Sequence, residues 1–179
     1  LGTTHELATV PNLPLIGNLY EKARQMRRLG VRGFMGTWNF GCMLTANPAA
    51  FNRFLAVPKL PPRGKALAAF AREYFPGCDG AGAAAAWEQF GRAMEQYPFN
   101  TGFLYYSCLN WSLAYPLRPS PANDRGPGRA WQIDRRGDQL RHSGYTLSET
   151  IRGLGRLARE WRRGAETLWE EWSYRLSAR

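Results

Sequence analysis

Two short apolar segments carry the first residues whose types could do chemistry. His5 and Glu6 lie within the first segment, and Trp38 and Asn39 stand at the end of the second. A sugar ring stacks on an indole face, while carboxylate and amide groups bind its hydroxyls, so these four residues would suit a saccharide. A simpler arrangement also fits, in which Trp38 fills the core and Glu6 faces solvent.

A second candidate site is the aromatic-rich segment of residues 99–116. Its side chains could line a saccharide groove, or they could cap the interior beneath a loop, and the sequence leaves both open. The candidate binding residues in this segment are Tyr105, Tyr106, Asn110 and Trp111.

The sequence offers neither a metal site nor a cofactor motif. Its histidines are His5 and His142, and Cys42, Cys78 and Cys108 are too widely spaced for a C-x-x-C pair. No phosphate-binding loop, dinucleotide-binding glycine pattern, G-x-S-x-G or H-E-x-x-H sequence occurs. We therefore expect no metal and no cofactor, and we can name no catalytic residue.

The chain is strongly basic, with a formal net charge of +10. The excess is spread evenly, with 11 basic and 6 acidic residues in 1–117 and 13 and 8 in 118–179. Because no nucleic-acid recognition motif accompanies the charge, nucleic acid is not the favoured partner. There is also no signal peptide or membrane-length apolar run, so we expect a soluble protein of unknown compartment.

Helix and strand signals alternate over residues 1–60. The order strand, helix, strand, helix is typical of parallel-sheet proteins. In the last of these helices, Asn47 is expected to be the N-cap and Pro48 the first helical residue. The expected elements are a strand at residues 3–10, a helix from Asn18 that Gly30 ends, a strand at residues 31–38 and a helix at residues 47–56.

Residues 61–179 are expected to be a helical region. Helices are predicted at 65–74 and 83–97, followed by the aromatic segment and a long Pro/Gly/Arg loop at 116–144. Thr146 and Glu149 have the spacing of a capping box, which predicts the start of a final helix. The fold class is thus mostly α with a short βαβα segment.

The final helix carries an apolar stripe that repeats every seven residues and therefore needs a partner helix. The partner could be the chain's own 83–97 helix, a helix beyond Arg179, or a second copy of the chain. The stripe consists of Leu147, Ile151, Leu154, Ala158, Trp161, Ala165, Leu168 and Trp172.

A resemblance adds to this interpretation. The stretch THELATVPNLPLIGNLYEKARQMRRLGVRGFMGTWNFG, followed by Asn47 and YPFN…YY, resembles the carboxyl-terminal part of large bacterial glycoside-hydrolase-like (β/α)8 proteins, which are related to the family 20 hexosaminidases. The resemblance implies that residues 3–10 and 31–38 are the last two barrel strands and that a helical region follows. The Asp-Glu catalytic pair of that family is missing from this chain.

We therefore predict a fragment of a glycoside-hydrolase-like protein that contributes carbohydrate-binding residues but no complete catalytic site. Glycoside cleavage needs two carboxyl groups flanking the bond, and Glu6 is the one acid placed near the supposed site. Two other functions stay open. The chain could be a helical interaction or oligomerisation module that uses the stripe at 147–172, or a basic nucleic-acid-binding domain.

Overall fold

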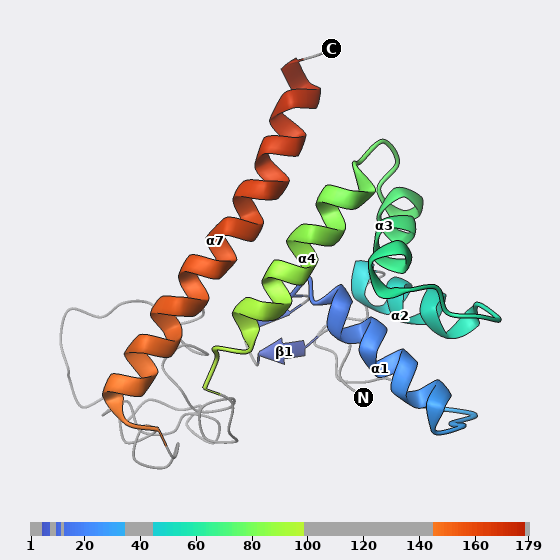
Figure 1. The fold of residues 1–179 in the computed structure, drawn as a ribbon, viewed down its shortest axis with the longest axis horizontal. Coiled ribbons are helices and arrows are strands. Elements are labelled where there is room, and N and C mark those ends of the chain that lie inside the picture. Colours follow the sequence, from blue (N-terminus) through green and yellow to red (C-terminus); the bar gives the residue numbers. More distant parts are fainter. Residues whose placement is uncertain (1–4, 8–9, 12, 35–44, 99–144, 178–179) are drawn as a thin grey trace, which may run out of the picture.

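The computed structural model describes residues 5–7, 10–11, 13–34, 45–98 and 145–177, and this part of the chain is mostly helical (Figure 1). Two very short strands, β1 (His5–Leu7) and β2 (Val10–Pro11), precede the helices. The helices are α1 (Ile16–Arg28), α2 (Ala46–Ala56), α3 (Arg63–Tyr74), α4 (Gly80–Met94) and α7 (Leu147–Ser177).

The expected first strand is divided in the structure. β1 and β2 pair antiparallel, with His5 opposite Pro11 and Leu7 opposite Val10. Residues 31–34, the start of the expected second strand, have no regular structure, and residues 35–38 lie outside the described part. Val31 and Phe34 are exposed, whereas a strand of a parallel sheet is covered on both faces. The parallel βαβα arrangement is therefore not what the described residues display.

Helix α1 ends as its sequence predicts. Gly30 has a φ of 65°, which glycine adopts without steric cost. The Val31 amide donates to the Met26 carbonyl at 3.0 Å, and the Gly30 amide donates to Arg27 at 3.1 Å. This pair of bonds is a Schellman motif, so the prediction that Gly30 terminates the helix is confirmed.

The predicted N-cap of α2 is wrong. The helix begins at Ala46, so Thr45 takes the N-cap place, and Asn47 is already helical. Asn47 is only 2% exposed, and its side-chain Nδ2 donates to the Leu13 carbonyl at 2.8 Å. A buried amide needs such a partner, so this side chain ties α2 to the segment before α1 instead of capping its own helix.

The core lies where α1, α2, α3 and α4 meet, and it draws on residues from both predicted segments, 1–60 and 61–179. One aromatic ring from each helix contributes to a continuous chain. The ring centroids of Tyr20 and Phe54 are 5.5 Å apart, those of Phe54 and Phe70 6.1 Å, and those of Phe70 and Trp87 6.0 Å. These separations are typical of favourable aromatic contacts, which here join all four helices.

Helix α4 begins earlier than residue 83 because Asp79 caps it. The two carboxylate oxygens of Asp79 accept hydrogen bonds from the amides of Ala81 at 3.0 Å and Gly82 at 2.8 Å. A free N-terminal amide of a helix gains about 1 kcal/mol from such a cap. The helix predicted from residue 83 therefore began three residues too late, because the capping signal of Asp79 was missed.

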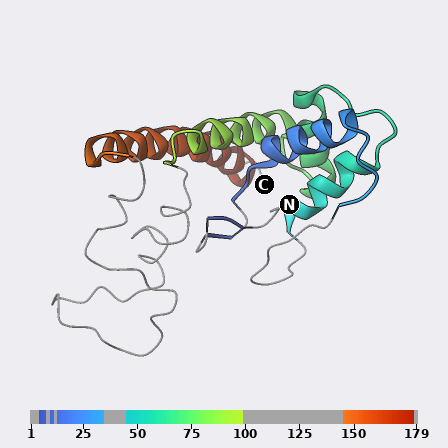
Figure 2. The ribbon, with the colours of Figure 1, turned by 90° about the horizontal axis from the view of Figure 1, so that it is seen from below.

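Helix α7 runs antiparallel to α4, and the C-terminal part of α7 extends past the N-terminal end of α4 (Figures 1 and 2). The predicted capping box starts it: the Glu149 amide donates to Thr146 Oγ1 at 3.2 Å, and the Thr146 amide donates to Glu149 Oε2 at 2.8 Å. Trp161 packs on Phe90 of α4 with ring centroids 4.5 Å apart. Of the partner helices considered for the apolar stripe, the chain's own α4 is thus one that α7 uses.

Candidate functional site

The predicted saccharide-binding residues are not placed by this structure. His5 and Glu6 belong to β1, of which the backbone alone is described. The other six lie outside the described residues, namely Trp38, Asn39, Tyr105, Tyr106, Asn110 and Trp111. A candidate site must therefore be sought elsewhere in the described part of the chain.

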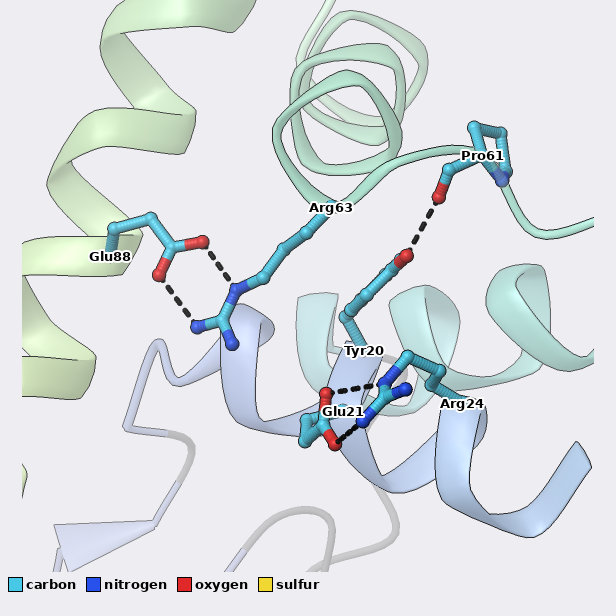
Figure 3. A network of polar contacts seen from close by, with 6 residues as sticks. All are labelled: Tyr20, Glu21, Arg24, Pro61, Arg63 and Glu88. Carbon is cyan, nitrogen blue, oxygen red and sulfur yellow. Dashed lines mark hydrogen bonds and ion pairs between the residues drawn. The ribbon is translucent and has the colours of Figure 1, made fainter. Parts of the chain in front are cut away.

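A network of charged residues lies at the junction of α1, α3 and α4 (Figure 3). Arg63 binds Glu88 through two hydrogen bonds, Nε to Oε1 at 2.5 Å and Nη2 to Oε2 at 2.6 Å. Arg24 binds Glu21 in the same two-pronged way, at 2.8 and 2.6 Å. Both carboxylates are thus held by a guanidinium group, the geometry of a strong charge-assisted pair.

The electrostatics of this network do not suit acid–base catalysis. The hydrogen bond from Arg24, followed by that from Gln25, lowers the pKa of Glu21 from 4.5 to about 2. A catalytic carboxyl group needs a pKa closer to neutrality so that it can exchange protons. Tyr20 completes the junction by donating to the Pro61 carbonyl at 2.7 Å. We therefore assign the Arg63–Glu88 and Tyr20–Pro61 contacts to the joining of helices, while Arg24 and Glu21 pair within α1.

Arg27 has a similar structural task at the end of α2. Its guanidinium donates to the carbonyls of Val57 at 2.6 Å, Pro58 at 2.5 Å and Leu55 at 3.2 Å. The last carbonyls of a helix lack partners within it and carry partial negative charge, so a cation is stabilising there. The basic residues of α1 and α3 considered so far thus hold the fold together.

The face of α7 that packs on α4 differs in part from the predicted stripe. Leu154, Trp161 and Leu168 do contact the core, as expected. The intervening positions are shifted by one residue, so Leu157 and Gly164 pack inward in place of Ala158 and Ala165. Gly164 fits there because it has no side chain to collide with α4, and the helices approach closely at that point.

Three residues of the predicted stripe, together with Trp169 from outside it, form a second, uncovered line on α7. Ile151 is 61% exposed and Trp169 74%, and Ala158 and Ala165 are exposed between them. These residues are spaced by seven, seven and four, which places them along one side of the helix. We call Ile151, Ala158, Ala165 and Trp169 the exposed strip.

Positive charge lies beside the exposed strip on the solvent side of α7. Its carriers are all exposed, and they fall within about 16 Å of helix length at 1.5 Å per residue. We call Arg152, Arg156, Arg159, Arg162 and Arg163 the arginine ridge. The whole-chain charge distribution hid this ridge, although the spacing of its arginines by three and four residues was a signal for it in the sequence.

Comparison with known proteins identifies no relative. No protein-family profile, characterised protein or solved structure matches the chain. Within the described residues, no group of three or more His, Cys, Asp and Glu side chains could hold a metal ion. None of the helices described is both long and apolar enough to span a membrane. We take the exposed strip and the arginine ridge of α7 as the candidate functional site, because exposed apolar side chains are aligned there beside concentrated positive charge.

Proposed function

We propose that this chain is a helical interaction module that binds a partner helix along the exposed strip of α7. The observation that carries the proposal is that α7 has two adjacent apolar lines, of which one is packed on the chain and the other is exposed. Leu154, Leu157 and Leu168 pack against the helices of the chain, while the exposed strip beside them faces solvent.

A single exposed hydrophobic side chain needs no explanation, but an aligned set on a long helix does. Helix α7 has 31 residues, and the strip follows it with the seven-residue spacing by which helices pair. Ala158 and Ala165 in its middle are small, so another helix backbone could come close. The large side chains of Ile151 and Trp169 at either end would then be covered.

The arginine ridge determines which helix would bind best. A partner with carboxylates beside its apolar line would meet Arg159 and Arg162, and a partner with lysines there would be repelled. Complementary charge speeds association and suppresses the wrong partners more than it adds affinity. We therefore expect discrimination between partners of opposite charge.

Designed helical peptides test the proposal. Two fluorescent peptides share one apolar line and differ in flanking residues, Glu in one and Lys in the other, and anisotropy reports binding to the full chain. We expect the Glu peptide to bind at least tenfold more tightly. Trp169→Glu should abolish this binding, whereas Leu29→Glu, at a residue that is 71% exposed at the far end of α1, should leave it intact. Failure of both peptides to bind would overturn the proposal.

The same assay distinguishes binding of nucleic acid from binding of a helical partner. A labelled single-stranded oligonucleotide that binds near 50 mM salt and is released by added salt would indicate phosphate contacts. If that binding survives Trp169→Glu while the Glu peptide does not bind, the ridge serves a polyanion and the helical partner is excluded. We expect the oligonucleotide to bind no more tightly than the Lys peptide.

The carbohydrate-related role and the barrel-end interpretation of residues 1–60 are further proposals that the sequence alone supports. They rest on Glu6, Trp38 and Asn39 and on the family resemblance. The described residues do not test the saccharide role, and the antiparallel pairing of β1 with β2 counts against the barrel end. Titrating the chain with oligosaccharides and following tryptophan fluorescence tests the role. A change that Trp38→Ala removes would support it, and a chain without any response would count against it.

A further inference from the structure

We propose that the helix bound by the exposed strip is α7 of a second copy of the chain, in antiparallel orientation. This inference rests on the interaction module proposed above and names its partner. Two properties of α7 carry it, the sizes of the residues on the strip and the order of charges beside it.

When a second copy of α7 is reversed, a large residue of the exposed strip on one copy comes opposite a small residue on the other. In an antiparallel pair centred between Arg163 and Gly164, Ala158 of one copy lies opposite Trp169 of the other, and the reverse contact occurs at the other end. Both residues are exposed in the single chain. A tryptophan needs room on the facing helix, and alanine supplies it, so the bulky side chain packs as a knob into a hole.

Opposite charges beside the exposed strip also come together across the pair in this register. Glu166 of one copy comes level with the turn between Arg159 and Arg162 of the other, and the twofold symmetry repeats the arrangement. All three side chains are exposed and lie next to the strip. A parallel pair would instead place the arginine ridges of the two copies on opposite flanks of the interface, so neither ridge would come beside Glu166 of the other copy. The charge order therefore selects the antiparallel pair.

A lipid surface is a weaker candidate for the same face. A helix that lies on a membrane inserts a wide apolar face of large side chains. The middle of the exposed strip consists of Ala158 and Ala165, which bury little apolar area in lipid but allow a helix backbone to come near. The other face of α7 is already occupied by α4.

Light scattering on the full chain provides the first test. The chain has a mass of 20.3 kDa, and we expect the measured mass to rise toward twice that value with concentration. A mass that stays at one chain up to the highest soluble concentration would overturn the inference. If such a monomer still bound the Glu peptide, the interaction module would stand and its partner would be a different protein. If the monomer bound neither the Glu peptide nor the Lys peptide, both proposals would fail.

A charge-swap experiment tests the pairing itself. One variant carries Arg159→Glu and Arg162→Glu, and the other carries Glu166→Arg. Each variant alone places like charges across the pair, so we expect dimerisation at least tenfold weaker than in the unchanged chain. An equal mixture of the two restores opposite charges and should recover a dimer that contains one copy of each.

The control is Lys65→Glu, which reverses one charge on an exposed residue of α3, away from α7, and should leave the dimer unaffected. Circular dichroism checks that every variant keeps its helix content, as we expect for substitutions at exposed positions. If the single variants dimerise as well as the unchanged chain, or if mixing them restores nothing, the antiparallel pairing is overturned.

Discussion

Gly164 of α7 lies directly against the ring of Phe90 in α4. A Cβ atom on Gly164 would stand 2.7 Å from Phe90 Cε1 and 2.9 Å from Cδ1, and 3.3 Å from the Ala86 carbonyl oxygen. The two distances to the ring are shorter than a carbon–carbon contact allows, and the distance to the carbonyl oxygen is tight. The absence of a side chain at this position thus sets how closely the two longest helices of the described chain approach.

Adding that single carbon should separate α4 from α7. We expect Gly164→Ala to lower the free energy of unfolding by about 1 kcal/mol, because an overpacking penalty of about 1–3 kcal/mol exceeds the helix-propensity gain of about 1 kcal/mol. Gly155→Ala is the matched control, since the nearest atom to its Cβ would be Arg159 Nη1 at 3.7 Å. That variant should be stabilised in urea denaturation. Equal effects of the two changes would contradict the close contact at Gly164.

The register of α7 on α4 is open to a direct test. Leu157 is partly buried against the core, whereas Ile151 is 61% exposed. We expect Leu157→Ala to cost about 1–2 kcal/mol of unfolding free energy, a reduced form of the penalty for a fully buried leucine. At a protein concentration low enough to exclude self-association, Ile151→Ala should change it by less than about 0.5 kcal/mol. The predicted sequence stripe requires the opposite order.

The Arg63–Glu88 pair should couple its two helices measurably. Each of its residues has two hydrogen bonds to the other, while Arg53 and Glu73 form a more exposed pair with one bond at 2.9 Å. Double-mutant cycles with Arg→Met and Glu→Gln isolate the interaction energies. We expect about 1 kcal/mol for the first pair and less than about 0.5 kcal/mol for the second. If the interaction energy of Arg63 and Glu88 were no larger than that of Arg53 and Glu73, Arg63 would not couple α3 to α4.

Glu21 makes stability depend on pH in the acidic range. Its pKa is about 2 in the folded chain, against an ordinary value of 4.5, chiefly because Arg24 donates hydrogen bonds to it. A lowered folded pKa means that its stabilising effect is complete above about pH 4.5 and is lost as the pH falls from there toward 2. Arg24→Gln should raise the NMR titration midpoint of the Glu21 carboxyl toward 4.5. A midpoint that does not move would show that another group lowers the pKa.

Local signals in the sequence predicted the helices well. Gly30 ended α1, and Thr146 with Glu149 began α7, because such motifs act through bonds within one helical turn. The same local logic failed at Asn47. An asparagine beside a proline is typical of an N-cap, but here the side chain found a tertiary partner in Leu13 that no local pattern reveals.

The candidate site was visible in the sequence only as part of a larger stripe. The repeat through Leu154, Trp161 and Leu168 correctly marked an apolar face of α7. It could not show that Leu157 and Gly164 would turn inward while Ala158 and Ala165 stayed outside. Nor could the overall charge of +10 show that five arginines would line the solvent side of one helix.

The sequence by itself determined the helical character of the chain, the end of α1 and the start of α7, since hydrogen bonds between near neighbours govern them. The tertiary structure decided which of two adjacent lines on α7 is buried. That choice depends on the shape of α4, where Phe90 leaves space for the bare backbone of Gly164 and for no side chain. The exposed strip is the consequence, because a helix packed on one line leaves the neighbouring line open to a partner.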